Sequence, residues 1–180
     1  MKNNNVPWKI HSTEELLHTP IFKVHVDKSE CPRTGRRGAF YKFKFENWVN
    51  IVAVTSKDEM VMIRQFRHGS GKWELEIPGG LIDPTDIDPV FAGQRELLEE
   101  TGYSGVNAKL IGSVCPNPAL QGNTCYTVFV DKAVKASETA MDDFEDIETV
   151  LVPVNNVRRL VKDGKISHGL VLNALMFYFF

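Results

Sequence analysis

The feature that most constrains this chain is the stretch 76–103, EIPGGLIDPTDIDPVFAGQRELLEETGY, whose second half predicts a short, well-delimited helix. Asp88 suits the N-cap, and Pro89 suits the first helical position because its missing N–H would be unpaired there anyway. Gly102 can adopt the left-handed conformation that ends a helix. The residues expected to pack inward are Phe91, Leu98 and, more laterally, Leu97.

Three carboxylates crowd onto one turn of this predicted helix. At about 100° per residue, Glu96 and Glu100 lie about 40° apart, and Glu99 lies about 60° to their other side. Like charges at this spacing repel by a few tenths of a kcal/mol, so a cation is expected to neutralise them. Oxygen-only ligands favour a hard cation, Mg²⁺ or Mn²⁺, over zinc. The alternative for such an acidic run is a solvated helix face.

The stretch resembles the Nudix box, which reads Gly, five residues, Glu, seven residues, Arg-Glu, aliphatic, any, Glu-Glu, any, Gly, aliphatic. Gly80 matches the opening, residues 95–102 match the catalytic block, and Tyr103 holds the terminal apolar place. The first glutamate of the pattern is replaced by Asp86, and eight residues rather than seven separate it from the block. The extra residue falls in the loop 84–89, so the helix should be little disturbed, but the role of Asp86 stays open.

The resemblance implies a Nudix fold of the α/β class, with a mixed β-sheet in an α/β/α sandwich. It also implies roles for the catalytic block. Glu96 and Glu100 are the main metal ligands, joined by a backbone carbonyl of Gly79, and Glu99 is a further or water-mediated ligand. Arg95 holds the glutamates through ion pairs.

The resemblance implies a catalytic base in the acidic loop 136–148, ASETAMDDFEDIE. The family's base precedes a metal-binding glutamate by two residues, which carries over to Asp143 as the base and Glu145 as an auxiliary metal ligand. A glutamate is common at the base position, so the shorter Asp143 leaves Glu138 as an alternative. A metal-acidified water without a protein base is the third possibility.

Outside the box, residues 62–80, MIRQFRHGSGKWELEIPGG, resemble the ADP-ribose and nucleoside-diphosphate-sugar pyrophosphatase branch. Pro118 lies fifteen places past Tyr103, where those enzymes carry a proline, although the branch's Ser-Pro-Gly reads Asn-Pro-Ala here. Strand alternation places Arg64 and Arg67 on opposite faces, and the resemblance favours Arg67. The residues expected to bind substrate are Arg67, Trp73, Glu76, Pro118 and Gln121. The alternatives are a core aromatic for Trp73 and a strand-edge ion pair for Glu76.

The predicted function is Mg²⁺-dependent hydrolysis of a nucleoside diphosphate linked to another group, with ADP-ribose cleaved to AMP and ribose 5-phosphate as the first candidate. The alternatives are GDP-mannose or another nucleoside-diphosphate sugar, a dinucleotide, CoA, or a nucleotide-binding module without turnover. Such a module can lose its metal ligands, whereas this chain has the complete Arg-Glu and Glu-Glu pairs. The enzyme is therefore favoured.

The remaining composition is that of an ordinary globular protein. The 180 residues carry a net charge of −2, which implies no bulk attraction to nucleic acid or to an anionic membrane. The three cysteines are widely spaced and suggest neither zinc nor a disulfide framework. The amino terminus lacks an apolar signal core, and no run reaches the roughly 18 apolar residues of a membrane span. A cytoplasmic enzyme is expected.

The chain is expected to form a β extension at 1–45 and a Nudix domain at 46–180. A short helical piece is predicted around 12–18, and strands with alternating apolar residues are predicted within 21–45. The resemblance implies that these antiparallel strands pair two subunits in a homodimer. Further strands are predicted at 50–55, 60–66, 73–77, 108–114, 126–131 and 148–154, and helices at 155–162 and 169–180.

Overall fold

The computed structural model describes residues 6–141 and 144–180, and it divides into two compact units. Unit 1 contains the described residues up to Glu46 together with Cys115–Asn123. Unit 2 contains Asn47–Val114 and the described part of Thr124–Phe180. The division runs close to the predicted boundary after residue 45, and it adds a later segment to the first unit. That the two parts are separate domains stays a prediction.

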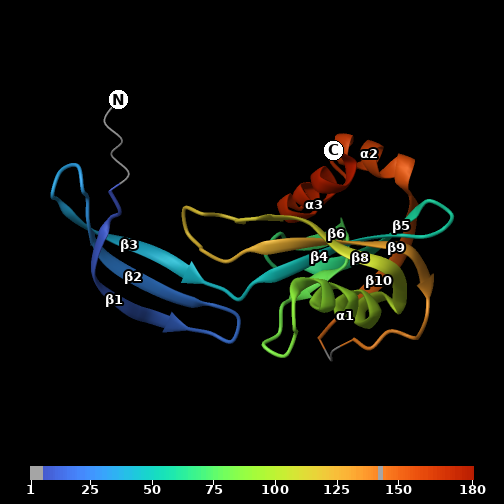
Figure 1. Cartoon of the computed structure of the whole chain (residues 1–180), viewed down its shortest axis with the longest axis horizontal. Coiled ribbons are helices and arrows are strands. Elements are labelled where there is room, and N and C mark those ends of the chain that lie inside the picture. The colour runs from blue at the N-terminus through green and yellow to red at the C-terminus, as the bar shows by residue number, and fades with distance from the viewer. Residues whose placement is uncertain (1–5, 142–143) are drawn as a thin grey trace. The chain divides into compact units, whose positions relative to one another are not determined.

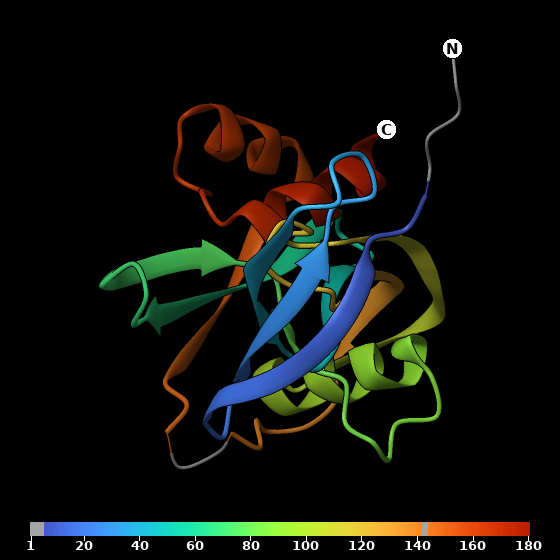
Figure 2. The ribbon, with the colours of Figure 1, turned by 90° about the vertical axis from the view of Figure 1, so that its left-hand side faces the viewer.

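Among its described residues, unit 1 has a three-stranded antiparallel sheet, and antiparallel strands were predicted for this amino-terminal extension. Its strands are β1 (Lys9–His18), β2 (Lys23–Glu30) and β3 (Arg37–Lys44), in that spatial order, and Figure 2 shows them in blue. The buried carboxylate of Asp27 in the middle strand ties all three together. It accepts hydrogen bonds from Thr13 Oγ1 at 2.6 Å and from Lys42 Nζ at 2.5 Å.

The helical piece predicted around Ser12–His18 is wrong, because these residues belong to β1. The strand pairs with β2 from Lys9 opposite Glu30 to His18 opposite Lys23, with register irregularities on the way. Local propensity is a weak signal over so few residues. Pairing with a neighbouring strand satisfies the backbone N–H and C=O groups that an isolated helical turn would leave open.

Unit 2 contains a mixed sheet that, within the described residues, has seven strands. They are β4 (Trp48–Val54), β5 (Glu59–Arg67), β6 (Lys72–Glu76), β7 (Gly79–Leu81), β8 (Tyr103–Val114), β9 (Cys125–Lys135) and β10 (Ile147–Pro153). The main order is β10-β5-β4-β9-β8, with β6 beside β5 and β7 beside β4. β4 and β9 run parallel and the other pairs antiparallel, so the predicted mixed sheet is confirmed.

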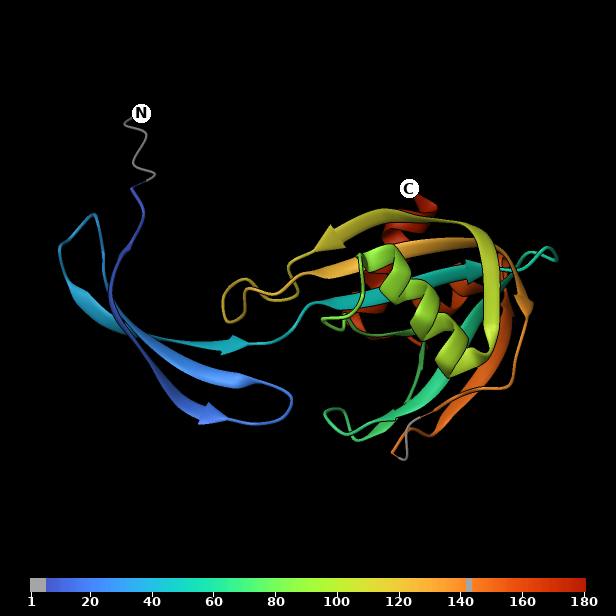
Figure 3. The same cartoon turned by 60° about the horizontal axis from the view of Figure 1, so that its bottom comes forward.

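In the described part of the chain, three helices cover this sheet: α1 (Pro89–Thr101), α2 (Val154–Lys162) and α3 (Gly169–Phe179). Figures 1 and 3 show α1 on one face and the other two helices on the opposite face. Each face has its own apolar core. Ala92 and Leu97 of α1 pack with Ile51 and Val128, whereas α2 and α3 pack on β4 and β5 residues such as Met62. The predicted α/β/α sandwich is therefore confirmed. No helix in the described part of the chain is both long and apolar enough to cross a membrane.

The ends of α1 follow the predicted signals. Asp88 Oδ1 accepts the backbone N–H of Phe91 at 2.8 Å, and Pro89 is the first helical residue. Gly102 ends the helix with φ of 67° and donates its N–H to Leu98 O at 2.7 Å. These contacts fix where the helix begins and ends, and with it the positions of the box glutamates.

The predicted inner face of α1 is wrong for two of its three residues. Phe91 and Leu98 are 46% and 38% exposed, whereas Leu97 is 1% exposed. The helix turns a narrower side to the sheet, because Gly93 allows close approach: a Cβ there would lie 3.1 Å from Val128 Cβ. Glu100 lies on this same buried side of the helix.

Leu97→Ala and Leu98→Ala form a matched pair that tests this orientation of α1. We expect Leu97→Ala to lower the free energy of unfolding by about 2–5 kcal/mol, because it leaves a cavity in the core. Leu98→Ala should lower it by less than about 1 kcal/mol, because its side chain is partly solvated. Urea unfolding followed by circular dichroism measures both. Equal losses would show that Leu98 packs inward after all.

Candidate active site

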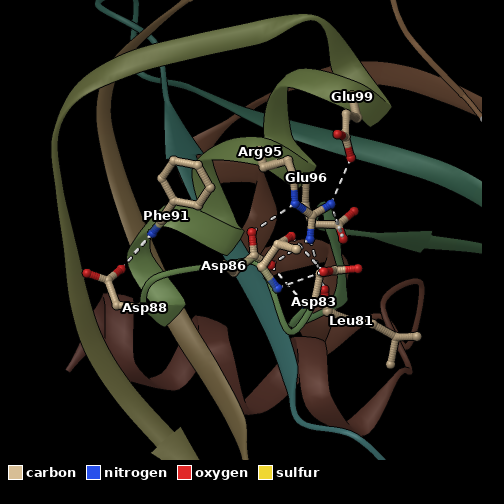
Figure 4. Close-up of polar contacts among 9 residues, drawn as sticks. Leu81, Asp83, Asp86, Asp88, Phe91, Arg95, Glu96 and Glu99 are labelled. Carbon is tan, nitrogen blue, oxygen red and sulfur yellow. Dashed lines mark hydrogen bonds and ion pairs between the residues drawn. The ribbon is translucent and has the colours of Figure 1, made fainter.

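The Arg95 guanidinium lies at the centre of the acidic cluster on α1 (Figure 4). Its Nε and Nη2 donate to the two carboxylate oxygens of Asp86 at 3.1 and 2.9 Å. Nη1 donates to Glu96 at 3.0 Å and to Glu99 at 2.8 Å, and Nη2 also donates to the Leu81 carbonyl at 3.1 Å. The ion pairs that the resemblance implied for Arg95 are thus present.

Asp86, whose role the sequence left open, is the bidentate partner of Arg95. Its side chain is 1% exposed, and the hydrogen bonds from Arg95 hold the pKa of this carboxyl below its usual value. A tight turn puts it there: the Asp83 N–H donates to Asp86 Oδ2 at 2.8 Å, and the Asp86 N–H donates to the Asp83 carbonyl at 2.9 Å. The loop therefore absorbs the extra residue and still delivers a carboxylate to Arg95.

Glu100 is the most buried of the three glutamates of the catalytic block, with an exposed fraction of 4%. It accepts the Gly79 N–H at 3.0 Å, which favours its charged form. Burial nevertheless raises its pKa to about 8, and the charges of Glu96 and Glu145 add to the rise. Burial also raises the pKa of Glu96, and the charges of Glu99 and Glu145 act in the same direction, against Arg95. Glu145 is therefore close enough to act electrostatically on both predicted main ligands.

The Pro-Gly-Gly turn is shaped to the glutamates that approach it. A Cβ on Gly80 would lie 2.5 Å from the Glu96 carboxylate. A Cβ on Gly79 would lie 2.5 Å from the Val49 carbonyl oxygen and 2.6 Å from Asn50 Oδ1. Neither position has room for a side chain, so the backbone of the turn comes directly against β4 at Gly79 and against the Glu96 carboxylate at Gly80.

The chemistry of this donor set fits a hard divalent cation. Glu96 and Glu100 offer oxygen ligands, and like-charge repulsion and burial both penalise their ionised forms. A cation would remove that penalty. In the conformation of the described residues, no three carboxylate, imidazole or thiolate side chains surround one point closely enough to hold a metal ion. Arg95 contacts one carboxylate oxygen of Glu96 and one of Glu99.

A pocket of about 920 Å³ adjoins the glutamates within unit 2. Residues that line it include Trp48, Asn50, Arg67, Glu76, Gly80 and His168. Because Gly80 lies against Glu96, this turn is shared by the pocket and the acidic cluster. The pocket therefore has an acidic edge and carries the guanidinium of Arg67 in its lining.

Glu76 is fixed by two other residues of this pocket. Arg67 Nε and Nη2 donate to Oε1 and Oε2 at 2.9 and 2.8 Å, and His168 Nδ1 lies 2.9 Å from Oε2. Burial disfavours the ionised Glu76, but the hydrogen bonds from His168 and Arg67 outweigh it and lower the pKa to about 2. The ion pair considered for Glu76 from the sequence is present. Sequence reasoning missed His168, whose one signal was its place immediately before the predicted last helix.

The other predicted site residues are spread over several places. Trp73 is 53% exposed and stacks edge-on against Phe66, so it is not a core aromatic. Pro118 and Gln121 belong to unit 1, and their contribution to substrate binding stays a prediction. Asp143 lies outside the described residues, and its alternative Glu138 is exposed.

Comparison with known proteins identifies the family of the chain. A model of the NUDIX domain family matches residues 45–175. The chain is 25% identical to the methanol dehydrogenase activator of Bacillus methanolicus, over 94% of this chain and 91% of the relative. It is 22% identical to the ADP-ribose pyrophosphatase of Bacillus subtilis (strain 168), with the same two coverages. A solved structure of an ADP compounds hydrolase has 22% identity and a TM-score of 0.83, covering 95% of this chain and 91% of that one, which shows the shared fold.

The chain therefore belongs to the NUDIX domain family. The predicted resemblance to this family and to its ADP-ribose pyrophosphatase-like branch is confirmed. The class of enzyme that these findings indicate is a Nudix pyrophosphohydrolase, and Nudix hydrolases generally use a divalent metal ion.

Glu100 should make the stability of the metal-free protein fall as the pH rises. Its pKa is about 8 in the folded protein against an ordinary 4.5, so between these values the folded state holds a proton that the unfolded chain has lost. The stabilisation that Glu100 contributes is complete below the unfolded pKa and is lost above the folded pKa. Between the two pKa values it falls by about 1.4 kcal/mol per pH unit. Urea unfolding in chelator across this range should show a shallower fall for Glu100→Gln than for the unmodified protein. Parallel curves would mean that Glu100 is ionised throughout.

Proposed function

We propose that the protein uses Mg²⁺ to hydrolyse the pyrophosphate bond of a nucleoside diphosphate linked to another group, and that ADP-ribose is its substrate. The products are then AMP and ribose 5-phosphate. The observation that carries the proposal is one pocket that has the cation of Arg67 in its lining and shares its Gly79–Gly80 turn with the acidic cluster of Glu96 and Glu100. A diphosphate in complex with a divalent cation needs negatively charged groups to bind the cation and a positively charged group to bind the phosphates. The name of the Bacillus subtilis relative supports ADP-ribose.

The residues of the pocket divide this work. Arg67 can place a guanidinium edge on phosphate oxygens, which it matches in geometry. Glu96 and Glu100, with Glu99, Glu145 and the Gly79 carbonyl, would hold the cation. When bound, Mg²⁺ screens the phosphate oxygens, stabilises the leaving phosphate and acidifies the attacking water.

The proton of the attacking water needs an acceptor that is not bound to metal. We propose Asp143 for this role, with Glu138 of the same loop as its alternative. An ionised carboxylate that accepts a hydrogen bond from the water both orients it and takes its proton as the phosphorus–oxygen bond forms. A loop residue suits the task, because loops can bring a side chain over a bound substrate.

The alternative substrates share with ADP-ribose the chemical group that we propose the pocket binds, the diphosphate. GDP-mannose, other nucleoside-diphosphate sugars, dinucleotides and CoA all carry a diphosphate, so the glutamates and Arg67 suit each of them. A binding module without turnover would have no need for the buried Glu100, whose ionised form is penalised by its surroundings. Retention of this carboxylate favours an enzyme.

A substrate panel tests the proposed activity. With Mg²⁺, we expect phosphatase-sensitive product from ADP-ribose at a higher rate than from ADP-glucose, GDP-mannose, NADH, diadenosine polyphosphates or CoA. Glu100→Gln should lower the rate about 100-fold or more, equivalent to about 2.7 kcal/mol, because it removes a charge that holds the cation. Glu148→Gln is the matched control, since Glu148 is 64% exposed and pairs with Arg64 on the surface.

Each other result of the panel has a defined meaning. A higher rate with another compound would keep the class of enzyme and change its substrate. Binding without turnover of any compound would identify a nucleotide-binding module. A rate for Glu100→Gln close to that of Glu148→Gln would remove Glu100 from the metal site.

We also propose that the protein is a homodimer paired through unit 1. Its β1 strand is exposed along its whole length and carries Ile10, Leu16 and Leu17, each about half exposed. Three strands need an apolar surface to bury against, and these exposed apolar side chains can supply one side of it. A second copy would supply that surface.

Light scattering tests the dimer. We expect a mass of about twice 20.3 kDa at micromolar concentration, and a shift toward the monomer for Leu17→Lys, which places a charge on the exposed strand. Lys9→Ala, at the other end of the same strand, is the control that removes a charge without adding one. A monomer with full activity would contradict the proposal.

A further inference from the structure

The Glu76 carboxylate connects two parts of unit 2 that are far apart in the sequence. Arg67 reaches it from the end of β5, and His168 reaches it from the residue that precedes α3. The Glu76 side chain is 2% exposed, whereas those of Arg67 and His168 are 40% and 37% exposed. Two partly exposed side chains, Arg67 and His168, are thus joined through the buried carboxylate of Glu76.

The contacts leave one edge of the Arg67 guanidinium available. Nε and Nη2 both donate to Glu76, and within the described residues no hydrogen bond involves Nη1. A guanidinium has five N–H donors in a fixed plane, so fixing the Nε–Nη2 edge also fixes the direction of the others. Because Arg67 lines the pocket, these remaining donors are the ones that a bound anion can use.

His168 holds the carboxylate that sets this direction. An ionised carboxylate only accepts hydrogen bonds, so the Nδ1 of His168, 2.9 Å from Oε2, carries the proton that it donates. The start of α3 is itself anchored to the sheet, because Asn50 Nδ2 donates to the Leu170 carbonyl at 3.2 Å. His168 therefore gives Glu76 a fixed attachment outside the β5–β6 pair.

We propose that His168 is a positioning residue that, through Glu76, fixes the plane of the Arg67 guanidinium for binding the diphosphate. The diphosphate part of this inference depends on the proposed function, whereas the positioning of Arg67 does not. Without His168, the remaining side-chain partner of Glu76 is Arg67, the residue whose guanidinium it orients. The pair can then rotate together, and the donors of Arg67 that face a ligand lose their fixed direction.

A neighbouring carboxylate on the same strand supplies the control. Glu74 accepts a hydrogen bond from Ser167 Oγ at 3.1 Å and lies 3.3 Å from Lys72 Nζ. Ser167 lies one residue before His168. Ser167→Ala thus removes a hydrogen bond to the buried carboxylate of Glu74 and leaves the contacts of Arg67 unchanged. A general loosening of the start of α3 would appear in both variants, whereas the proposed positioning acts only through His168.

The direct test is a spectroscopic one that needs no ligand. In protein labelled with ¹⁵N at arginine, we expect the Arg67 Nε–H signal to be protected from solvent exchange. The exchange should accelerate about tenfold or more in His168→Ala and stay within about twofold in Ser167→Ala. His168→Asn should restore protection, because its Nδ2 is bonded to Cγ as the histidine Nδ1 is. Unchanged exchange in His168→Ala, with its thermal unfolding confirming a folded protein, would overturn the proposal.

A double-mutant cycle then connects positioning to binding. Calorimetry with ADP-ribose in chelator, where no turnover occurs, should give a Kd about tenfold higher for His168→Ala. In the Arg67→Ala background the same change should add less than about twofold, because its route to the ligand has been removed. Two losses that multiply would overturn the route through Arg67. Exchange as expected in a protein that neither binds nor cleaves ADP-ribose would keep the positioning role and reject the proposed substrate.

Discussion

The Glu100 carboxylate lies between α1 and the sheet with little access to solvent and, in the described part of the chain, one hydrogen-bond donor, the Gly79 N–H. Placing a carboxylate there disfavours its ionised form, and two like charges nearby disfavour it further. The surrounding structure must therefore hold the helix in place without help from this group. Leu97 and Gly93, one and two turns before it, pack on the sheet and hold the helix there.

Two guanidinium–carboxylate pairs organise the polar part of unit 2 in the same way. Arg95 places its Nε–Nη2 edge on Asp86, and Arg67 places the same edge on Glu76. Each carboxylate is buried, so each pair holds its guanidinium in place and fixes the direction of the remaining N–H donors. The donors of Arg95 are used within the protein, on the box glutamates. Those of Arg67 lie in the lining of the pocket, where we propose that they bind a ligand.

Sequence reasoning succeeded where a short stretch determines its own structure. Asp88, Pro89 and Gly102 fix the ends of α1 by local hydrogen bonds and backbone preference, and these could be predicted. The orientation of the helix could not, because it depends on Gly93 approaching Val128 of a strand about 35 residues later. His168 was missed for the same reason. Its partner Glu76 lies 92 positions earlier, and no local pattern identifies such a pair.

The opposite charges in the pocket also affect one another. Arg67 lowers the pKa of Glu100, and Glu100 helps to raise the pKa of Arg67. A cation held by the glutamates would reduce the negative charge that attracts this guanidinium, and so strengthen its interaction with an anion. Because such coupling is reciprocal, an anion on Arg67 would strengthen cation binding to the same extent. A complex of a divalent cation with a diphosphate supplies both charges together, so this pocket should select the complex over either component alone.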